Sequence, residues 1–413
     1  MKQNILNLLS DPRGLEHCYR NNREEFKKVF LDLYPEIRGN PVADCWKERF
    51  DDSEPLGLSV PRKDLWLVGA LALLCGLLAK MPFLLGIDPD YFYPRTIGFI
   101  AFLGPMIFFA LKEGLALRKA IGLGLFMLAL VAYIHWLPNN PASDTLVLAS
   151  IHLVFFLWAF LGFLFTGGRY ELDGRLQFLR YTGNLVVLGS LLLSAGGLAS
   201  AITIGLFSLI GYQIADTYME NVGIFGLAAL PVVATWINRM NPLLVGRISP
   251  LIARIFSPLV LVMLSIYLAA MGYAGKNPYH DREFLMLFNV LLLAVLALIF
   301  FAIPAEGNAG DSKIWLWILF LLAVLTAGVN VIALSAILFR LSSWGVTPNR
   351  LAVLVANGLI MITMLRVTWQ LLQVLRGKES LESAGVPMGQ IMPILALWAL
   401  FVTLAFPFLF AFK

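Results

Sequence analysis

Eleven long apolar runs, separated by short polar segments, dominate this chain of 413 residues. Hydrophobic residues make up 59% of it and charged residues 14%, whereas a soluble domain carries roughly 25% charged residues. Soluble cores stop growing near about 250–300 residues, so no soluble core is large enough to bury this much apolar surface. The composition predicts an all-α integral membrane protein, a bundle of about eleven transmembrane helices that has the lipid bilayer as its partner.

The lengths of the runs fit this prediction, because a helix needs about 20 residues to cross roughly 30 Å of hydrocarbon. Two runs are shorter, and each contains a proline, Pro105 or Pro231. Short, proline-interrupted spans are typical of transporter binding sites. The predicted spans are Asp64–Leu85, Thr96–Leu111, Ala120–Leu137, Thr145–Phe165, Leu185–Gly211, Val222–Ile237, Leu251–Gly272, Phe284–Ile303, Trp315–Phe339, Leu351–Leu375 and Ile391–Phe412.

Residues 1–61 differ in composition from residues 62–413. Apolar residues at helical spacing predict a helix over Glu24–Ile37, ending near Pro35, and a second helix that begins at Pro41. From Met1 to Lys63 the chain has eleven basic and eleven acidic residues. We expect a small N-terminal cytosolic helical module, which either rests on the membrane part or docks a protein partner.

Basic residues alternate in density between successive loops. One set of loops carries thirteen Lys or Arg and the other set carries five. The positive-inside rule then predicts a cytoplasmic N-terminus and a C-terminus on the opposite, periplasmic side. The basic excess is thereby explained by topology, and no nucleic acid partner is expected. A further amphipathic stretch, Tyr170–Tyr181, is interpreted as a helix on the cytoplasmic surface.

The segment Arg340–Arg350, predicted as an outer loop, carries the clearest local signal. Thr347 fits a helix cap and Pro348 the first helical position, so Arg350 falls in the first turn of the tenth span, where a cation opposes the helix dipole. Arg340 and Arg350 also both lie on the side where the charge rule disfavours them. These arginines, with Trp344, form either a structural clamp or a contact to an anionic ligand.

Two acids on the same predicted side are candidate partners for these arginines. Asp216 and Glu220 stand four residues apart, so they share a helical face, in a loop that has no cation of its own. They are interpreted either as an acidic vestibule or as solvated loop acids.

Polar residues inside the predicted spans are expensive and are therefore functional candidates. Arg366, Gln370 and Gln373 form one stripe on the tenth span, which we expect to face the bundle interior and to contribute to ligand binding. Asn330 and Asn357 are expected to bond across neighbouring helices, and Lys80 to extend towards the interface.

No known catalytic arrangement is visible in the sequence. His135 and His152 flank Asp144, but the two histidines are predicted at different depths, so isolated interfacial histidines are favoured over a zinc site. There is no serine–histidine–acid set, phosphate loop or nucleotide fingerprint. We therefore expect no catalytic residue, no metal and no cofactor.

Two stretches, the Trp-Gly-x-Thr-Pro-Asn-Arg core of Arg340–Arg350 and Tyr91-Phe-Tyr-Pro-Arg95, resemble motifs of multi-pass bacterial membrane proteins. This family is catalogued as domain of unknown function, number forty-one fifty-three. The resemblance covers roughly Asp64 to Leu375. It implies a bacterial inner membrane setting and supplies no reaction.

Three functions remain open. The first is a transporter-like protein that handles a small or amphipathic anionic ligand through an outward-facing polar vestibule at the residues named above. The second is an envelope scaffold or sensor subunit that docks a partner through residues 1–61. The third is an integral membrane enzyme acting on lipid.

Overall fold

The computed structural model describes residues 2–21, 23–51, 62–140, 142–240, 248–274, 282–303 and 313–413. These residues form helices and contain no strand. The chain divides into two compact units, Met1–Leu65 and Trp66–Lys413. The all-helical prediction is therefore confirmed for the described part of the chain.

The smaller unit contains four short helices: α1 (Lys2–Leu8), α2 (Pro12–Asn21), α3 (Arg23–Ile37) and α4 (Pro41–Asp51). Aromatic side chains fill its core, with Phe26 and Phe30 fully buried and Trp46 nearly so. The predicted helix at Pro41 is confirmed. Pro35 lies inside α3, which ends two residues later at Ile37. Pro35 cannot donate to the carbonyl four residues before it, and the helix continues only a short way past it.

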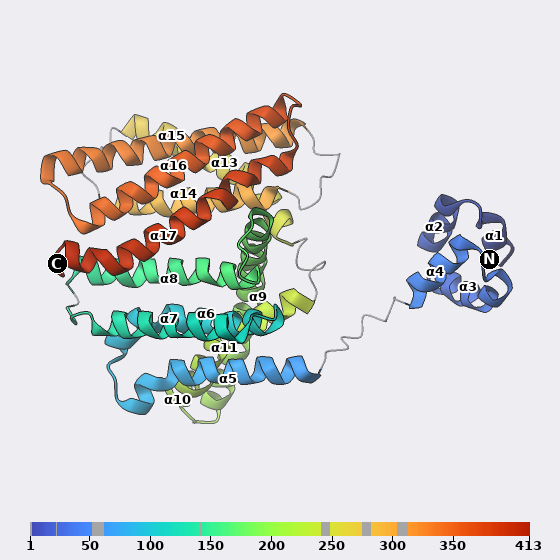
Figure 1. Ribbon diagram of the computed structural model, residues 1–413, viewed down its shortest axis with the longest axis horizontal. Helices are drawn as coiled ribbons and strands as arrows, with labels where there is room; N and C mark the ends of the chain where they lie inside the picture. The colour runs from blue at the N-terminus through green and yellow to red at the C-terminus, as the bar shows by residue number, and fades with distance from the viewer. Residues whose placement is uncertain are drawn as a thin grey trace. The chain divides into compact units, whose positions relative to one another are not determined.

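The described part of the larger unit consists of long helices and a few short helical turns (Figure 1). They are α5 (Arg62–Leu85), α6 (Pro89–Lys112), α7 (Leu117–Trp136), α8 (Asp144–Phe165), α9 (Leu172–Leu209), α10 (Ala215–Tyr218), a π-helical turn (Met219–Gly223), α11 (Ile224–Met240), α13 (Ile248–Ala274), α14 (Arg282–Ala302), α15 (Lys313–Trp344), α16 (Pro348–Leu375), a 3-10 turn (Leu381–Gly385) and α17 (Val386–Leu409).

Among the described residues, ten helical segments are long and apolar enough to cross a membrane. The apolar part of α14, Phe288–Ala302, is a shorter eleventh segment. The prediction that the second and sixth spans are short is wrong. Helix α6 has 24 residues and Ala215–Met240 has 26, because both helices begin well before the apolar run starts.

The start of α6 shows why its length was missed. The Asp88 side chain accepts a hydrogen bond from the backbone N–H of Asp90 (3.0 Å), and Pro89 occupies the first helical position. This cap and proline begin the helix seven residues before Thr96. Arg95, which lies outside the predicted span Thr96–Leu111, is therefore within α6.

The predicted surface helix at Tyr170–Tyr181 is also corrected. From Leu172 on, these residues form the first turns of α9, which continues without a break to Leu209. Phe178 and Tyr181 are buried against the bundle, so the apolar side of this stretch packs on protein.

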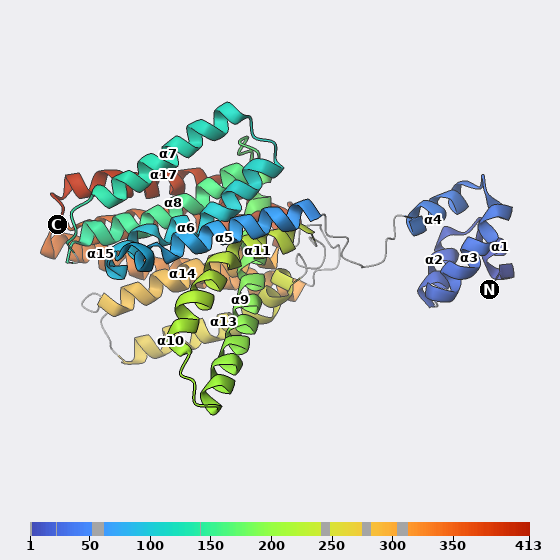
Figure 2. The same cartoon turned by 90° about the horizontal axis from the view of Figure 1, so that it is seen from below.

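Packing joins the helices of the larger unit into one bundle. Helix α15 packs on α16, α8 lies between α6 and α17, and α9 lies on α11. In Figure 1 the connections from α5 to α9 alternate between two ends of the bundle, whereas the α9–α11 turn extends to one side of it in Figure 2. At the α5 end lie the start of α5 and the α6–α7 and α8–α9 loops. At the C-terminal end lie the α7–α8 and α15–α16 loops and Lys413.

A hydrogen bond from the Thr145 N–H to the Lys413 carbonyl (2.9 Å) joins the start of α8 to the chain terminus at the C-terminal end. The outward faces of several helices remain apolar and exposed. On α9, which extends from the bundle together with α11 in Figure 2, they include Leu191, Leu198, Ile202 and Leu206. Such a surface fits a lipid environment better than water.

Candidate functional site

The predicted cluster of Arg340, Trp344 and Arg350 is brought together at the C-terminal end of the bundle, although most of it is not a loop. Arg340 and Trp344 lie in the last turns of α15, which extends five residues beyond the predicted span. Both guanidinium groups lie near the Trp344 ring, at 5.8 Å for Arg340 and 5.6 Å for Arg350. The predicted cap is confirmed, because the Thr347 side chain accepts a hydrogen bond from the Arg350 N–H (3.4 Å).

The contacts of Arg350 explain why a cation is tolerated in the first turn of α16. Its Nη1 donates to the carbonyls of Trp344 (2.9 Å) and Gly345 (2.7 Å). The last carbonyls of a helix have no partner within it and carry partial negative charge. Arg350 therefore caps α15 from α16, and of the two interpretations given above these contacts support the structural clamp.

The two predicted acids lie elsewhere. Asp216 is in α10 and Glu220 in the π-helical turn, and both are exposed. Figure 1 places α10 and α15 at opposite edges of the bundle. The structure therefore does not bring these acids to Arg340 and Arg350.

Lys80 contacts the backbone carbonyl of Glu220. Its Nζ donates to the Glu220 carbonyl (2.7 Å) and to Oδ1 of Asn221 (3.1 Å). A π-helical turn widens the helix and changes which carbonyls are bonded within it. These bonds tie α5 to this turn, and the extension of Lys80 to the interface stays a prediction.

The polar stripe on α16 is separate from the Trp344 cluster. Arg366 lies sixteen residues after Arg350, which is about 24 Å along a helix. Arg366 is exposed and donates from Nη2 to Oε1 of Gln390, while Gln370 and Gln373 are half-buried. The expectation that the stripe faces the bundle interior is therefore wrong for Arg366.

The expected bond between Asn330 and Asn357 is confirmed. Both side chains are buried, and Nδ2 of Asn330 donates to the Asn357 carbonyl (3.1 Å). Nδ2 of Asn357 in turn donates to Oδ1 of Asn289 (2.8 Å). These bonds connect α14, α15 and α16, as interhelical polar contacts commonly do.

A buried arginine on α6 is the most unusual polar group at the C-terminal end. Arg95 is 3% exposed. Its guanidinium lies 4.2 Å from the Tyr91 ring centroid, Nη1 donates to the Tyr91 carbonyl (2.9 Å) and Nη2 to Oδ1 of Asn139 (3.2 Å). Its Nε has no hydrogen-bond partner, and Arg95 forms no ion pair with a described residue.

Neutral groups hold this arginine in place. The Tyr91 hydroxyl donates to the His135 carbonyl (3.1 Å) and lies 3.2 Å from Nδ1 of His135, while Oγ1 of Thr96 lies 3.1 Å from Nε2. A neutral imidazole with its hydrogen on Nδ1 satisfies all three contacts, because Thr96 then donates to Nε2. The surroundings therefore fix the position of Arg95 without balancing its charge.

Sequence reasoning missed this cluster for two reasons. The predicted second span begins at Thr96 and leaves Arg95 outside it. His135 is predicted from the sequence as an isolated interfacial histidine. The described residues contain no group of three or more potential metal ligands. The available signal was the aromatic and basic stretch Tyr91–Arg95 directly after an Asp-Pro helix start.

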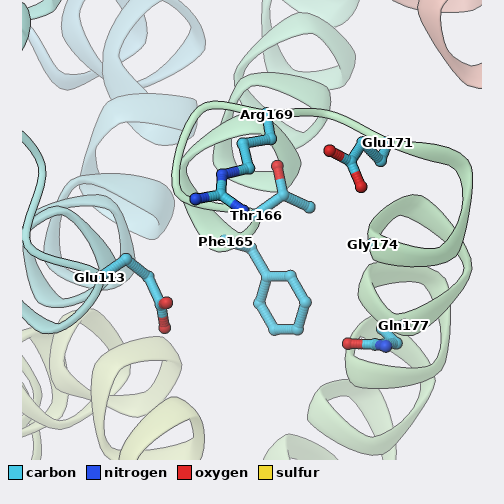
Figure 3. A pocket seen from close by; sticks show the side chains of 7 residues that line it. All are labelled: Glu113, Phe165, Thr166, Arg169, Glu171, Gly174 and Gln177. Carbon is cyan, nitrogen blue, oxygen red and sulfur yellow. The ribbon is translucent and has the colours of Figure 1, made fainter.

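At the α5 end, a cavity of about 240 Å³ opens between the ends of α6 and α8 and the start of α9. Its lining residues are Glu113, Phe165, Thr166, Arg169, Glu171, Gly174 and Gln177. Figure 3 shows the charged and amide groups arranged around the Phe165 ring. Glu113 is ion-paired with Arg239 (2.8 Å).

The loop that supplies Arg169 and Glu171 contains a strained residue between them. Tyr170 has a φ of 52°, in the left-handed region, which costs an L-residue roughly 1–2 kcal/mol. Its N–H donates to Oγ1 of Thr166 (3.1 Å) and its ring packs on Phe163. Burial raises the pKa of the Tyr170 hydroxyl, so this side chain stays neutral. Strain of this kind is concentrated at functional sites.

No family model, no curated protein and no solved structure matches this chain. The resemblance to the family of domain of unknown function, number forty-one fifty-three, therefore stays a prediction.

Proposed function

We propose that the larger unit spans a bacterial inner membrane, with the α5 end in the cytoplasm and Lys413 in the periplasm. Ten apolar helices, exposed apolar side chains and alternating loops support this topology. The sequence count of basic residues, thirteen against five, predicts the cytoplasmic side at the end where α5 starts. A reporter fused after Lys413 tests the orientation, because activity of a cytosol-specific reporter there contradicts it.

We further propose a transporter-like function, in which the C-terminal end binds a small anionic ligand. The single observation that carries this proposal is Arg95, a buried guanidinium without a negative partner among the described residues. Removing a charge of this size from water costs several kcal/mol unless another charge compensates it. An anion beside Nε would supply both the missing charge and the missing hydrogen-bond acceptor.

The position of Arg95 suggests how a ligand would reach it. Asn139, in the connection between α7 and α8, is exposed and accepts a hydrogen bond from Nη2 of Arg95. We propose that a ligand reaches the guanidinium by displacing this side chain. This proposal moves the ligand contact from Arg350, which caps α15, to Arg95 at the same end of the bundle. It assigns no ligand contact to Arg366, Gln370, Gln373, Asp216 or Glu220.

The test uses full-length protein in detergent with chloride, acetate or inorganic phosphate as probe. An anion bound at a hundredfold excess over its Kd stabilises the folded state by about 2.7 kcal/mol, which is visible as a higher melting temperature. We expect this shift in the wild type and in Arg118→Gln, an exposed control. We expect no shift in Arg95→Gln.

Transport is then measured in proteoliposomes with the stabilising anion, and Arg95→Gln is expected to abolish uptake. If no probe stabilises the wild type, or if Arg95→Gln responds like the control, Arg95 is not the ligand site. If the wild type binds the anion but does not take it up, the protein binds anions at this site and the transport function is rejected.

A second function, partner docking by the smaller unit, is favoured by its separate aromatic core. A small folded unit of this kind is compatible with an envelope scaffold or sensor subunit. A stoichiometric partner that co-purifies with the full chain and is lost when residues 1–55 are deleted supports this function. Identical co-purification from both proteins rejects it.

A further inference from the structure

The cavity at the α5 end contains two opposite charges that do not pair with each other. Arg169 and Glu171 are separated by one residue, and neither forms an ion pair with a described residue. The left-handed backbone of Tyr170 sets the directions in which its two neighbours leave the chain. In Figure 3 both side chains lie on the rim of one cavity.

The remaining wall of the cavity is close to neutral. Glu113 is already balanced by Arg239 (2.8 Å), and Gln177 contributes an uncharged amide. The available charges are therefore one cation and one anion. A singly charged ligand would be attracted by one of them and repelled by the other, whereas a ligand with both charges would satisfy both.

The size and the aromatic surface of the cavity limit the ligand further. Its volume of about 240 Å³ is below the ~300–1,000 Å³ of pockets for drug-sized molecules. The Phe165 ring lies among the polar groups, where an ammonium group can rest on its face.

We propose that this cavity binds a small zwitterionic group, with the ammonium group against Glu171 and Phe165 and the anionic group against Arg169. The aminoethyl phosphodiester head group has this chemistry, either as part of a lipid or as a free molecule. The cavity is independent of Arg95, so the failure of either proposal leaves the other standing.

The test titrates glycerophosphoethanolamine into full-length protein in lipid-free detergent, with dimethyl phosphate and ethanolamine as probes that carry one charge each. We expect the zwitterion to bind at least tenfold more tightly than either single-charge probe. Arg169→Gln and Glu171→Gln should each weaken binding at least tenfold. The controls Arg118→Gln and Asp173→Asn, exposed residues close to the same end, should stay within twofold of the wild type.

A second arm measures lipid retention by native mass spectrometry after incubation with phosphatidylethanolamine or phosphatidylglycerol. Selective retention of the former by the wild type and both controls, but not by Arg169→Gln or Glu171→Gln, identifies the lipid as the source even without soluble binding. Melting temperatures confirm that the variants are folded. The proposal is overturned if both arms show no selectivity, or if both variants bind like the wild type.

Discussion

Truncating one phenylalanine should unfold the smaller unit while the larger unit stays folded. Phe26 is fully buried in α3, and its ring lies 5.3–6.2 Å from the rings of Tyr19, Phe30, Trp46 and Phe50. A buried phenylalanine replaced by alanine costs about 3–5 kcal/mol. The unit Met1–Leu65 has only roughly 3–10 kcal/mol of total stability. Phe26→Ala therefore removes a large part or all of it.

Limited trypsin digestion of the full-length protein measures this loss, since Lys27 and Lys28 directly follow Phe26. Cleavage of a transiently opened unit follows its equilibrium population. A loss of about 4 kcal/mol raises that population nearly a thousandfold, because every 1.4 kcal/mol is tenfold. The control Cys45→Ala changes an exposed side chain on α4 and should be cleaved at the wild-type rate.

Wild-type protease resistance of Phe26→Ala would refute this reasoning. It would mean that the aromatic core does not hold the unit together, or that contacts elsewhere supply its stability. A simultaneous loss of melting cooperativity in the larger unit would also contradict the expectation that each unit has its own core.

Three further predictions concern a helix cap, a close helix approach and a tyrosine. Arg350→Lys replaces a guanidinium that donates to two carbonyls at the end of α15. We expect a loss of about 1–3 kcal/mol of folding stability, seen as a lower melting temperature in detergent. An unchanged melting temperature would reject the clamp. Gly76→Ala places a Cβ against the Phe225 ring of α11 and should cost about 1–3 kcal/mol. Gly69→Ala, on the same helix in open space, should change stability by no more than ~1 kcal/mol, so equal melting temperatures of the two variants would contradict the prediction. The pKa of Tyr34 is raised, chiefly because its hydroxyl donates to Asp44. This bond therefore stabilises the smaller unit below the ordinary tyrosine pKa of 10.0, and the stabilisation is lost as the pH rises through the folded pKa. The difference in trypsin resistance between wild type and Tyr34→Phe should be present at neutral pH and absent well above pH 10, and a pH-independent difference would argue against the bond.

The sequence determined the helices and several local contacts. Apolar runs identified every long helix in the described part of the larger unit. Thr347 and Pro348 fixed the start of α16, and Asn330 and Asn357 were paired correctly across two helices. These predictions succeeded because caps and helix periodicity act over a few neighbouring residues, and because a buried amide must find a partner.

The tertiary structure decided which charges have partners. Arg350 opposes the dipole of its own helix, and only its proximity to the end of α15 shows why it is tolerated. Arg95 lies outside the predicted second span, and only the fold shows that it is buried beside Tyr91 and Asn139. Arg169 and Glu171 share a cavity because the ends of α6 and α8 meet the start of α9. The energy of a charge depends on the groups around it in space, and the order of residues along a helical chain does not specify which helix ends become neighbours.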